Sequence, residues 1–373
     1  MLPIGHHKNP VGREWRWKVD PPDLIVDEAI SRHVAMVKEF RGAPGVQSAR
    51  WEAALTPRHC ALSLVGEPIM YPHVNELVKL LHDRGLSSFL VTNAQFPDAI
   101  AALGPVTQLY VSVDAATRDA LKAVDRPLFA DFWERFVACL QALRAKRART
   151  VYRLTLVKGE GGNMAPGAAH DYAKLVALGA PEFIEVKGVT WSGVSDGSTL
   201  TMANVPWHYE VRAFCEELTA AVAERKKEAG LTAVGGGAGG AGGGDVVPTY
   251  ALAAEHAHSC CVLIAQEKYR IEGIWHTHIN YERFHELVQR FYSTGEVFGP
   301  EDFTAPTPDW AAWGSNEAGF APSDVRWRRG DNKKLAEAAA ASAKEGDVGG
   351  GEGGDGGEVD QLDPYAPSES GCG

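Results

Sequence analysis

Five polar or ionisable residues follow short apolar runs in this sequence: Glu67, Asn93, Asp114, Lys158 and Lys187. Each run is nearly continuous in apolar residues, which is typical of strands buried on both faces of a parallel sheet. The carboxyl ends of such strands meet at one edge, and the sites of α/β proteins lie there. The sequence therefore predicts one site that combines carboxylate, amide and ammonium groups.

Glu67 lies in the stretch LVGEPIMYP, residues 64–72. Gly66 allows the backbone to approach a ligand closely, and Pro68 restricts the chain as it leaves the strand. This arrangement predicts a carboxylate that points to the mouth of the site, where it suits a ligand ammonium group.

Lys158 and Lys187 both stand in the local sequence V-K-G. A partly desolvated lysine at a strand end can lose its proton near neutral pH and form a Schiff base with a carbonyl substrate. That chemistry would make the protein an iron-independent lyase. The alternative is an ion pair with a strand-end carboxylate such as Glu185 or Glu67, and the sequence alone favours the ion pair.

Alternating strands and helices must position these residues. The predicted strands are CALSLVGEP (60–68), SSFLVTNAQ (87–95), TQLYVSVDA (107–115), TVYRLTLVKG (150–159) and EFIEVKGVT (182–190). Helical patterns such as VNELVKLLHDRG, which ends at Gly85, lie between them. Repeated βα units predict an α/β fold with a parallel sheet or partial barrel around one cavity.

Charge is distributed unevenly along the 373 residues, whose formal net charge is -11. From Asp331 onward there are ten acidic residues and three lysines, a net of -7, which leaves -4 for the rest. Two basic clusters contain tryptophan, a composition found in RNA-binding surfaces but also in solvated ones. The RNA-binding candidates are Lys8, Arg13, Trp15, Arg16, Trp17, Lys18, Arg326, Arg328 and Arg329.

Metal-binding signals are weak. Six cysteines have neither CxxC nor CxxxC spacing, so no metal ligand is predicted from a local motif. His276 and His278 share a face of a predicted strand, and with His6 and His7 they make only a weak candidate set. No apolar stretch approaches the roughly 20 residues of a membrane span and no apolar targeting segment opens the sequence, so we expect a cytoplasmic location.

Two low-complexity segments suggest the domain limits. The glycine tract and the acidic tail lack the apolar residues that would offset the entropy of ordering. We expect a barrel in residues 1–233, a disordered insert in 234–245, a C-terminal hairpin and helix extension in 246–330, and a disordered tail in 331–373.

Several long blocks together resemble one enzyme family. The blocks are GHHKNPVGREWRWKVD, LSLVGEPIMYP, VTNAQFP, SVDAA, YRLTLVKG, EVKGVTWSG and PTPDWAAWGS. In this order they resemble the radical S-adenosylmethionine (radical SAM) tRNA 4-demethylwyosine synthases of wybutosine biosynthesis, over most of residues 5–330. The resemblance implies a (β/α)6 partial barrel, a 4Fe-4S cluster and S-adenosylmethionine, which carry the difficult chemistry while the protein positions them.

The resemblance also implies a reaction and its participants. Family members are lyases that condense carbons of pyruvate with N1-methylguanosine-37 of phenylalanine tRNA, and a flavodoxin-type protein can donate the electron. Glu185 and Lys187 would face the substrate. The residues that would contact S-adenosylmethionine are Gly66, Glu67, Pro68, Asn93, Ser112, Asp114, Arg153 and Thr155.

One family feature is absent from the sequence. The family has a CxxxCxxC loop just before the block that begins GHHKNPVG, whereas this sequence begins MLPIGHHKNPVG. Cysteine thiolates hold iron-sulfur clusters. We therefore expect a barrel without its first strand and cluster loop, a chain that does not assemble the cluster by itself, and a fragment of a working enzyme. The alternative is a non-catalytic, cluster-free tRNA-binding relative.

Overall fold

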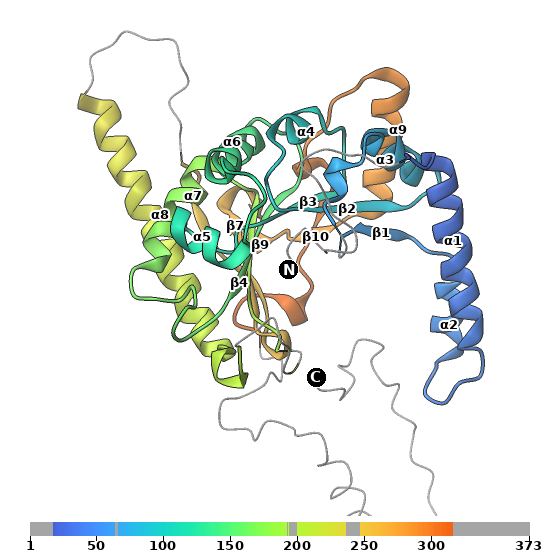
Figure 1. Ribbon diagram of the computed structural model, residues 1–373, viewed down its shortest axis with the longest axis horizontal. Coiled ribbons are helices and arrows are strands. Elements are labelled where there is room, and N and C mark those ends of the chain that lie inside the picture. The colour runs from blue at the N-terminus through green and yellow to red at the C-terminus, as the bar shows by residue number, and fades with distance from the viewer. Residues whose placement is uncertain (1–17, 64–65, 192, 194–199, 236–246, 316–373) are drawn as a thin grey trace, which may run out of the picture.

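The five predicted strands form the parallel part of one sheet, in the order of the sequence (Figure 1). The computed structural model describes residues 18–63, 66–191, 193, 200–235 and 247–315. The parallel strands are β1 (His59–Leu62), β2 (Ser87–Thr92), β3 (Gln108–Ser112), β4 (Thr150–Leu156) and β5 (Phe183–Gly188). Each pairs with the next in parallel register, which confirms the predicted α/β fold class.

Two antiparallel strands that the sequence reading did not place in this sheet extend it beyond β5. They are β6 (Tyr250–His256) and β7 (Cys261–Gln266), and the sheet order is β1-β2-β3-β4-β5-β7-β6. The sequence predicted a hairpin within residues 246–330. There β6 and β7 pair antiparallel, and β7 also pairs antiparallel with β5, which the sequence did not indicate. The pairing is non-local, so no pattern within the segment reveals it.

Side chains alternate between two faces of the sheet. One face is apolar and packs in the main hydrophobic core, as Val111, Leu154, Val186 and Ile264 do. This alternation places the intervening side chains, among them Arg153, on the opposite face, as the two-residue period of a strand requires. The second face is therefore where the polar strand residues gather.

Helices cover the apolar face. They are α3 (Val74–Asp83), α4 (Pro97–Ala102), α5 (Arg118–Asp125), α6 (Phe132–Arg144), α7 (Ala168–Gly179) and α8 (His208–Gly235). The predicted helix end at Gly85 is confirmed: α3 is followed by Arg84 and then by Gly85 with φ of 72°. At the end of α7, Gly179 permits close packing, because a Cβ there would lie 1.8 Å from the hydroxyl oxygen of Tyr152.

The C-terminal elements include one helix that packs beside α3. They are the small strands β8 (Arg270–Ile271), β9 (Ile274–Trp275), β10 (His278–Ile279) and β11 (Thr304–Ala305), and the helix α9 (Tyr281–Thr294). The buried ring of His82 on α3 makes hydrogen bonds through Nε2 with Ser88 Oγ at 2.8 Å and through Nδ1 with Tyr292 at 3.2 Å. These bonds join α9 to α3 and β2, and α9 is the helix that the sequence predicted in this extension.

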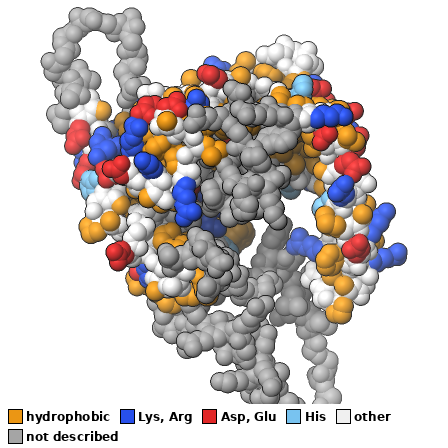
Figure 2. Space-filling view, in the orientation of Figure 1, with side chains coloured by type: hydrophobic (Ala, Val, Ile, Leu, Met, Phe, Trp, Pro, Cys, Tyr) orange, Lys and Arg blue, Asp and Glu red, His pale blue; other side chains and the backbone are white. Residues whose placement is uncertain are grey.

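Two N-terminal helices project along one side of the molecule (Figure 1). They are α1 (Pro22–Glu39) and α2 (Ser48–Ala54), and α2 has no buried residue. Figure 2 shows lysine and arginine side chains around this pair. Beside them, β1 pairs with β2 alone among the described strands, so it forms one edge of the sheet. Of the described helices, none combines the length and apolar character needed to cross a membrane.

Candidate functional site

The strand register brings five of the predicted site residues together on the face opposite the helices. Ser112 pairs with Arg153, and Arg153 with Glu185. One step further along the strands, Thr155 pairs with Lys187. Paired residues point to the same side of a sheet, and neighbouring strands lie about 4.8 Å apart. The five side chains therefore form one polar surface, which we call the inner face.

Electrostatic contacts connect side chains on the inner face. Arg153 Nε lies 3.5 Å from Glu185 Oε1, and both side chains are partly exposed. Glu185 also accepts a long hydrogen bond of 3.5 Å from the hydroxyl of Tyr110. Burial raises the pKa of Tyr110, and the nearby Glu185 carboxylate raises it further. Tyr110 is thus a neutral donor on this face. The sequence did not single out Tyr110, because a tyrosine within an apolar strand cannot be distinguished by pattern from an aromatic residue of the core.

The structure gives Glu67 a more enclosed position than the sequence predicted. Gly66, with φ of 73°, provides the left-handed turn before it. The carboxylate is 7% exposed and accepts a 2.8 Å hydrogen bond from the backbone N–H of Asn93 through Oε2. It also interacts with the side chain of Thr92. Glu67 therefore joins the loop after β1 to the end of β2, instead of standing freely in an open mouth.

The enclosure of Glu67 changes its titration. Burial raises its pKa from 4.5 to about 7, against hydrogen bonds from Asn93, Thr92 and Ile69 that lower it. A nearby cation would restore the ionised form, because an opposite charge favours ionisation. The site thus has a carboxyl group whose charge depends on what binds beside it.

Among the buried polar atoms that lack a hydrogen-bond partner, three belong to residues of the predicted site. They are Oε1 of Glu67, Oδ1 of Asn93 and Nε of Arg153. Leaving such groups unpaired costs about 1–3 kcal/mol each, so native proteins rarely retain them without a ligand or water. Together they offer two acceptors and one cationic donor. That set fits a ligand with an ammonium or hydroxyl group and a carboxylate.

Asp114 has a partner that the sequence did not indicate. Its carboxyl group interacts with that of Asp125, at the end of α5. Burial raises the pKa of both groups, and the neighbouring Asp114 helps to raise that of Asp125 to about 7. The backbone carbonyl of Asp114 accepts hydrogen bonds from Asn163 and Tyr172. The two carboxyls are therefore expected to share a proton near neutral pH.

The two strand-end lysines, Lys158 and Lys187, have different contacts. Lys158 forms an ion pair with Glu210 of α8, with Nζ 2.7 Å from Oε2. Lys158 thus forms an ion pair, but its partner lies on a helix and is not the strand-end carboxylate, such as Glu185 or Glu67, that the sequence predicted. Lys187 instead remains on the inner face, paired in register with Cys261 of β7. Burial raises the pKa of the Cys261 thiol to about 12, so this cysteine is a neutral neighbour.

Most RNA-binding candidates fall outside the described residues. Within them, Lys18 is exposed at the start of the described chain. The candidates outside the described residues are Lys8, Arg13, Trp15, Arg16, Trp17, Arg326, Arg328 and Arg329.

The described part of the chain does not indicate a metal site. No group of three or more His, Cys, Asp or Glu residues there is arranged to hold a metal ion. His276 makes a 3.0 Å contact through Nδ1 with the carbonyl of Ile274, and His6 and His7 lie outside the described residues. All described cysteines are free thiols, and the printed sequence contains no CxxxCxxC. The residues present therefore do not fit a 4Fe-4S cluster.

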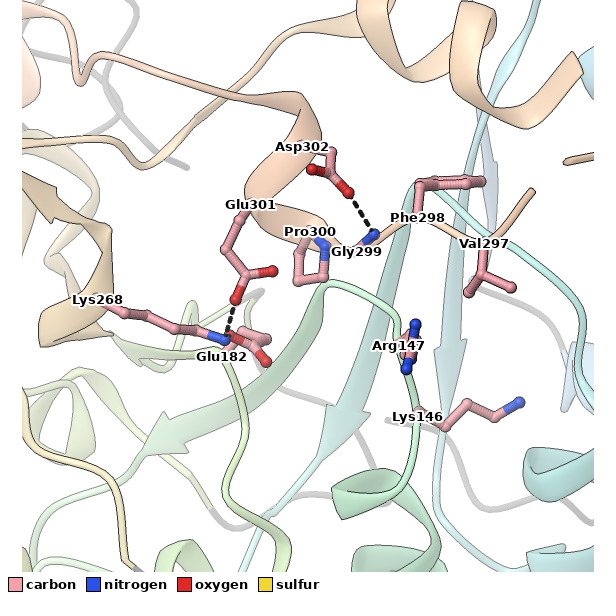
Figure 3. Close-up of a pocket in the computed structure, with 10 residues that line it drawn as sticks. All are labelled: Lys146, Arg147, Glu182, Lys268, Val297, Phe298, Gly299, Pro300, Glu301 and Asp302. Atoms are coloured by element: carbon pink, nitrogen blue, oxygen red, sulfur yellow. Dashed lines mark hydrogen bonds and ion pairs between the residues drawn. The ribbon is translucent and has the colours of Figure 1, made fainter. Parts of the chain in front are cut away.

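A hollow lies at the opposite end of the strands, near the amino ends of β4 and β5 (Figure 3). Lys268 forms ion pairs there with Glu182 and Glu301, at 2.7 and 2.5 Å. Lys146 on another part of the wall donates to the carbonyl of Leu103, and burial lowers its pKa to about 8. Lys268, Glu182 and Glu301 thus neutralise one another, and Lys146 binds backbone, which favours a structural role for these groups at the amino ends of β4 and β5.

The fold and the inner face define a class of protein. Residues 12–170 match the radical SAM superfamily, and residues 178–266 match the family of wyosine base formation. The chain belongs to the radical SAM superfamily.

Its relatives identify the family within that class. The chain is 53% identical over 331 residues to the S-adenosyl-L-methionine-dependent tRNA 4-demethylwyosine synthase TYW1 of Mus musculus, which covers 88% of this chain and 42% of the relative. It is 53% identical to the synthase of Oryza sativa subsp. japonica, over 87% of this chain and 45% of the relative. The chain is a member of the tRNA 4-demethylwyosine synthase family, as the sequence blocks indicated, and it spans less than half the length of these relatives.

Solved structures support the fold. A structure of TYW1 with a lysine-pyruvate adduct bound is similar with a TM-score of 0.54 and 24% identity, over 67% of this chain and 70% of the other. The crystal structure of archaeal TYW1 has a TM-score of 0.51 and 24% identity, over 70% and 76% of the two chains. At this level of identity the similarity concerns the fold alone.

Proposed function

We propose that this chain contributes the S-adenosylmethionine site and the tRNA-facing surface of a tRNA 4-demethylwyosine synthase. The overall reaction would be that of a lyase of the radical SAM class, in which carbons of pyruvate are condensed with N1-methylguanosine-37 of phenylalanine tRNA in the cytoplasm. The electron donor would be a flavodoxin-type protein. Cluster binding is not part of what these residues provide.

One observation carries the cofactor assignment: Oε1 of Glu67, Oδ1 of Asn93 and Nε of Arg153 are buried without a hydrogen-bond partner, and the nearest acidic group to that Nε is Glu185, in an ion pair at 3.5 Å. The methionine part of S-adenosylmethionine has an ammonium and a carboxylate group. Oε1 of Glu67 and Oδ1 of Asn93 would accept hydrogen bonds from the ammonium, and the guanidinium of Arg153 would donate to the carboxylate. When bound, S-adenosylmethionine supplies the radical chemistry of the superfamily.

The remaining residues of the site would support this contact. Gly66 and Pro68 shape the loop that carries Glu67, and Ser112 lies in register beside Arg153. Thr155 and the shared-proton carboxyl of Asp114 would be available for the ribose hydroxyls. Glu185 and Lys187, further along the inner face, would contact the nucleotide substrate or pyruvate.

Binding of radiolabelled S-adenosylmethionine to the 373-residue chain in equilibrium dialysis tests this proposal. We expect Arg153→Met to weaken binding by about 10-fold or more, because a hydrogen bond to a charged group is worth about 1.5–3 kcal/mol. Asn93→Leu should weaken it by a smaller factor. A suitable control is Arg118→Met, since Arg118 lies on the surface and pairs with Glu134.

The control should bind as the unchanged chain does. Equal affinity of Arg153→Met and the unchanged chain would remove Arg153 from the site. S-adenosylhomocysteine as a competitor reports on the same contacts, because it keeps the ammonium and the carboxylate. Failure of both compounds to bind the unchanged chain would contradict the proposed cofactor site as a whole.

A further inference from the structure

Two tryptophans in one short segment have opposite environments. The segment 309–315 includes the 3-10 helix Asp309–Ala311 and runs along the free side of β6. Trp313 is partly buried against the main core, and the guanidinium carbon of Arg212 lies 4.3 Å from its ring centroid. Trp310, three residues earlier, is 50% exposed. The segment thus anchors one indole ring and presents the other.

Backbone contacts hold the segment in place. Ala312 forms a bridge with Ala254, and the N–H of Trp313 donates to the carbonyl of Ala253 at 3.2 Å. The N–H of Gly314 donates to Oε1 of the buried Glu255 at 2.9 Å. An aromatic residue fixed in this way loses little conformational entropy on binding, which favours recognition.

Trp310 also has aromatic neighbours. The ring of His256 lies 6.0 Å from that of Trp310, at an interplanar angle of 82°. The ring of His258 lies 6.1 Å from that of His256. His256 Nδ1 contacts Ser259 Oγ at 2.6 Å, which orients the central ring. We call Trp310, His256 and His258 the aromatic cluster.

The register places the aromatic cluster beside the inner face. His256 pairs with Cys261, and Cys261 pairs with Lys187. Two strand spacings of about 4.8 Å therefore separate His256 from Lys187 across the sheet. Asn93, which belongs to the proposed cofactor site, lies beyond β2, and four strands stand between β2 and β6. The aromatic cluster is thus near the proposed substrate residue Lys187 and four strands away from the end of β2, where Asn93 lies.

The chemistry of this surface suits an unpaired nucleobase. Proteins that recognise single-stranded RNA stack unpaired bases on exposed aromatic side chains, including tryptophan and histidine. We propose that Trp310, supported by His256 and His258, stacks on an unpaired base of the RNA substrate next to the inner face. This proposal rests on the proposed function, because it assumes that the chain binds tRNA.

Fluorescence anisotropy with a labelled anticodon stem-loop RNA tests the role of Trp310 in the 373-residue chain. We expect Trp310→Ala to raise the Kd by about 10-fold, the usual effect of losing one stacked base. Trp310→Phe should recover most of the affinity, because a smaller aromatic ring still stacks. A matched control is Phe40→Ala, which removes another exposed aromatic ring, at the end of α1. A second arm uses the same stem without its loop, for which Trp310→Ala should make no difference.

The outcomes separate this inference from the function on which it rests. If the unchanged chain binds the stem-loop no better than the loop-free stem, the proposed recognition of tRNA fails. If it prefers the stem-loop but Trp310→Ala binds equally well, only the role of Trp310 is overturned. Loss of S-adenosylmethionine binding in Trp310→Ala with RNA binding unchanged would also overturn it, by assigning the ring to the adenine of the cofactor.

Discussion

The substitution Glu67→Gln tests the central electrostatic argument about the site. Burial holds the pKa of Glu67 at about 7, against its usual 4.5. At about 1.36 kcal/mol per pKa unit, this difference corresponds to ~3 kcal/mol of stability lost when the carboxyl is ionised. The folded chain binds the proton more tightly than the unfolded chain does. Stability therefore falls as the pH rises from 4.5 to about 7, and the loss is complete above that range.

Glutamine removes this pH dependence while keeping the shape of the side chain. The free energy of unfolding of Glu67→Gln, minus that of the unchanged chain, should grow by about 2–3 kcal/mol between pH 5 and pH 8. Urea unfolding followed by circular dichroism at several pH values measures it. The change with pH is the informative quantity, because the unpaired amide of glutamine alters the free energy of unfolding by the same amount at every pH.

Glu134→Gln is a control with the opposite sign. The pKa of Glu134 is lowered by a hydrogen bond from its own backbone N–H and by the hydrogen bond with Arg118, so its ionised form is favoured in the folded chain. Its substitution should give a difference that does not grow with pH. A flat profile for Glu67→Gln between pH 5 and pH 8 would refute the argument that the buried carboxyl is ionised at a cost.

The same variant also tests the ligand contact. If the ammonium of S-adenosylmethionine lies beside Glu67, Glu67→Gln should bind it about 10-fold more weakly or worse, as expected for a lost hydrogen bond to a charged group. Unchanged affinity would leave Glu67 as a link between the loop after β1 and the end of β2, without a role in binding.

Three further substitutions test the packing that supports the site. His82→Ala should lower the free energy of unfolding at pH 7 by about 2–4 kcal/mol in urea melts, because it leaves a cavity and unpaired hydroxyls. Burial lowers the pKa of His82 to about 3, so the unchanged chain should lose stability as the pH falls from 6.5 toward 3, and His82→Ala should lose less over that range. Gly179→Ala should lower the melting temperature markedly, because the new Cβ would overlap the hydroxyl of Tyr152, and a chain that melts normally would contradict this packing. Lys158→Met should cost about 1–3 kcal/mol by leaving the partly buried Glu210 without its cation, and a double substitution with Glu210→Gln should recover part of that loss in the same melts.

Local sequence patterns predicted the parallel strands well. The five apolar runs and the helix that ends before Gly85 depend on neighbouring residues, so their order and type could be inferred. The inner-face position of Arg153 and Lys187 also follows from alternation along a strand. The direction of the Glu67 side chain could not be inferred, because it depends on the backbone of Asn93, which is distant in sequence.

The sequence by itself determined the order of βα units, the polar residues at the strand ends and the family to which the blocks belong. Only the tertiary structure decided that β7 pairs with β5, that Asp114 meets Asp125, and that Trp310 lies exposed beside His256. The physical reason is the range of the interactions. Side-chain periodicity is encoded within a few residues, whereas strand pairing and burial depend on contacts between segments far apart along the chain.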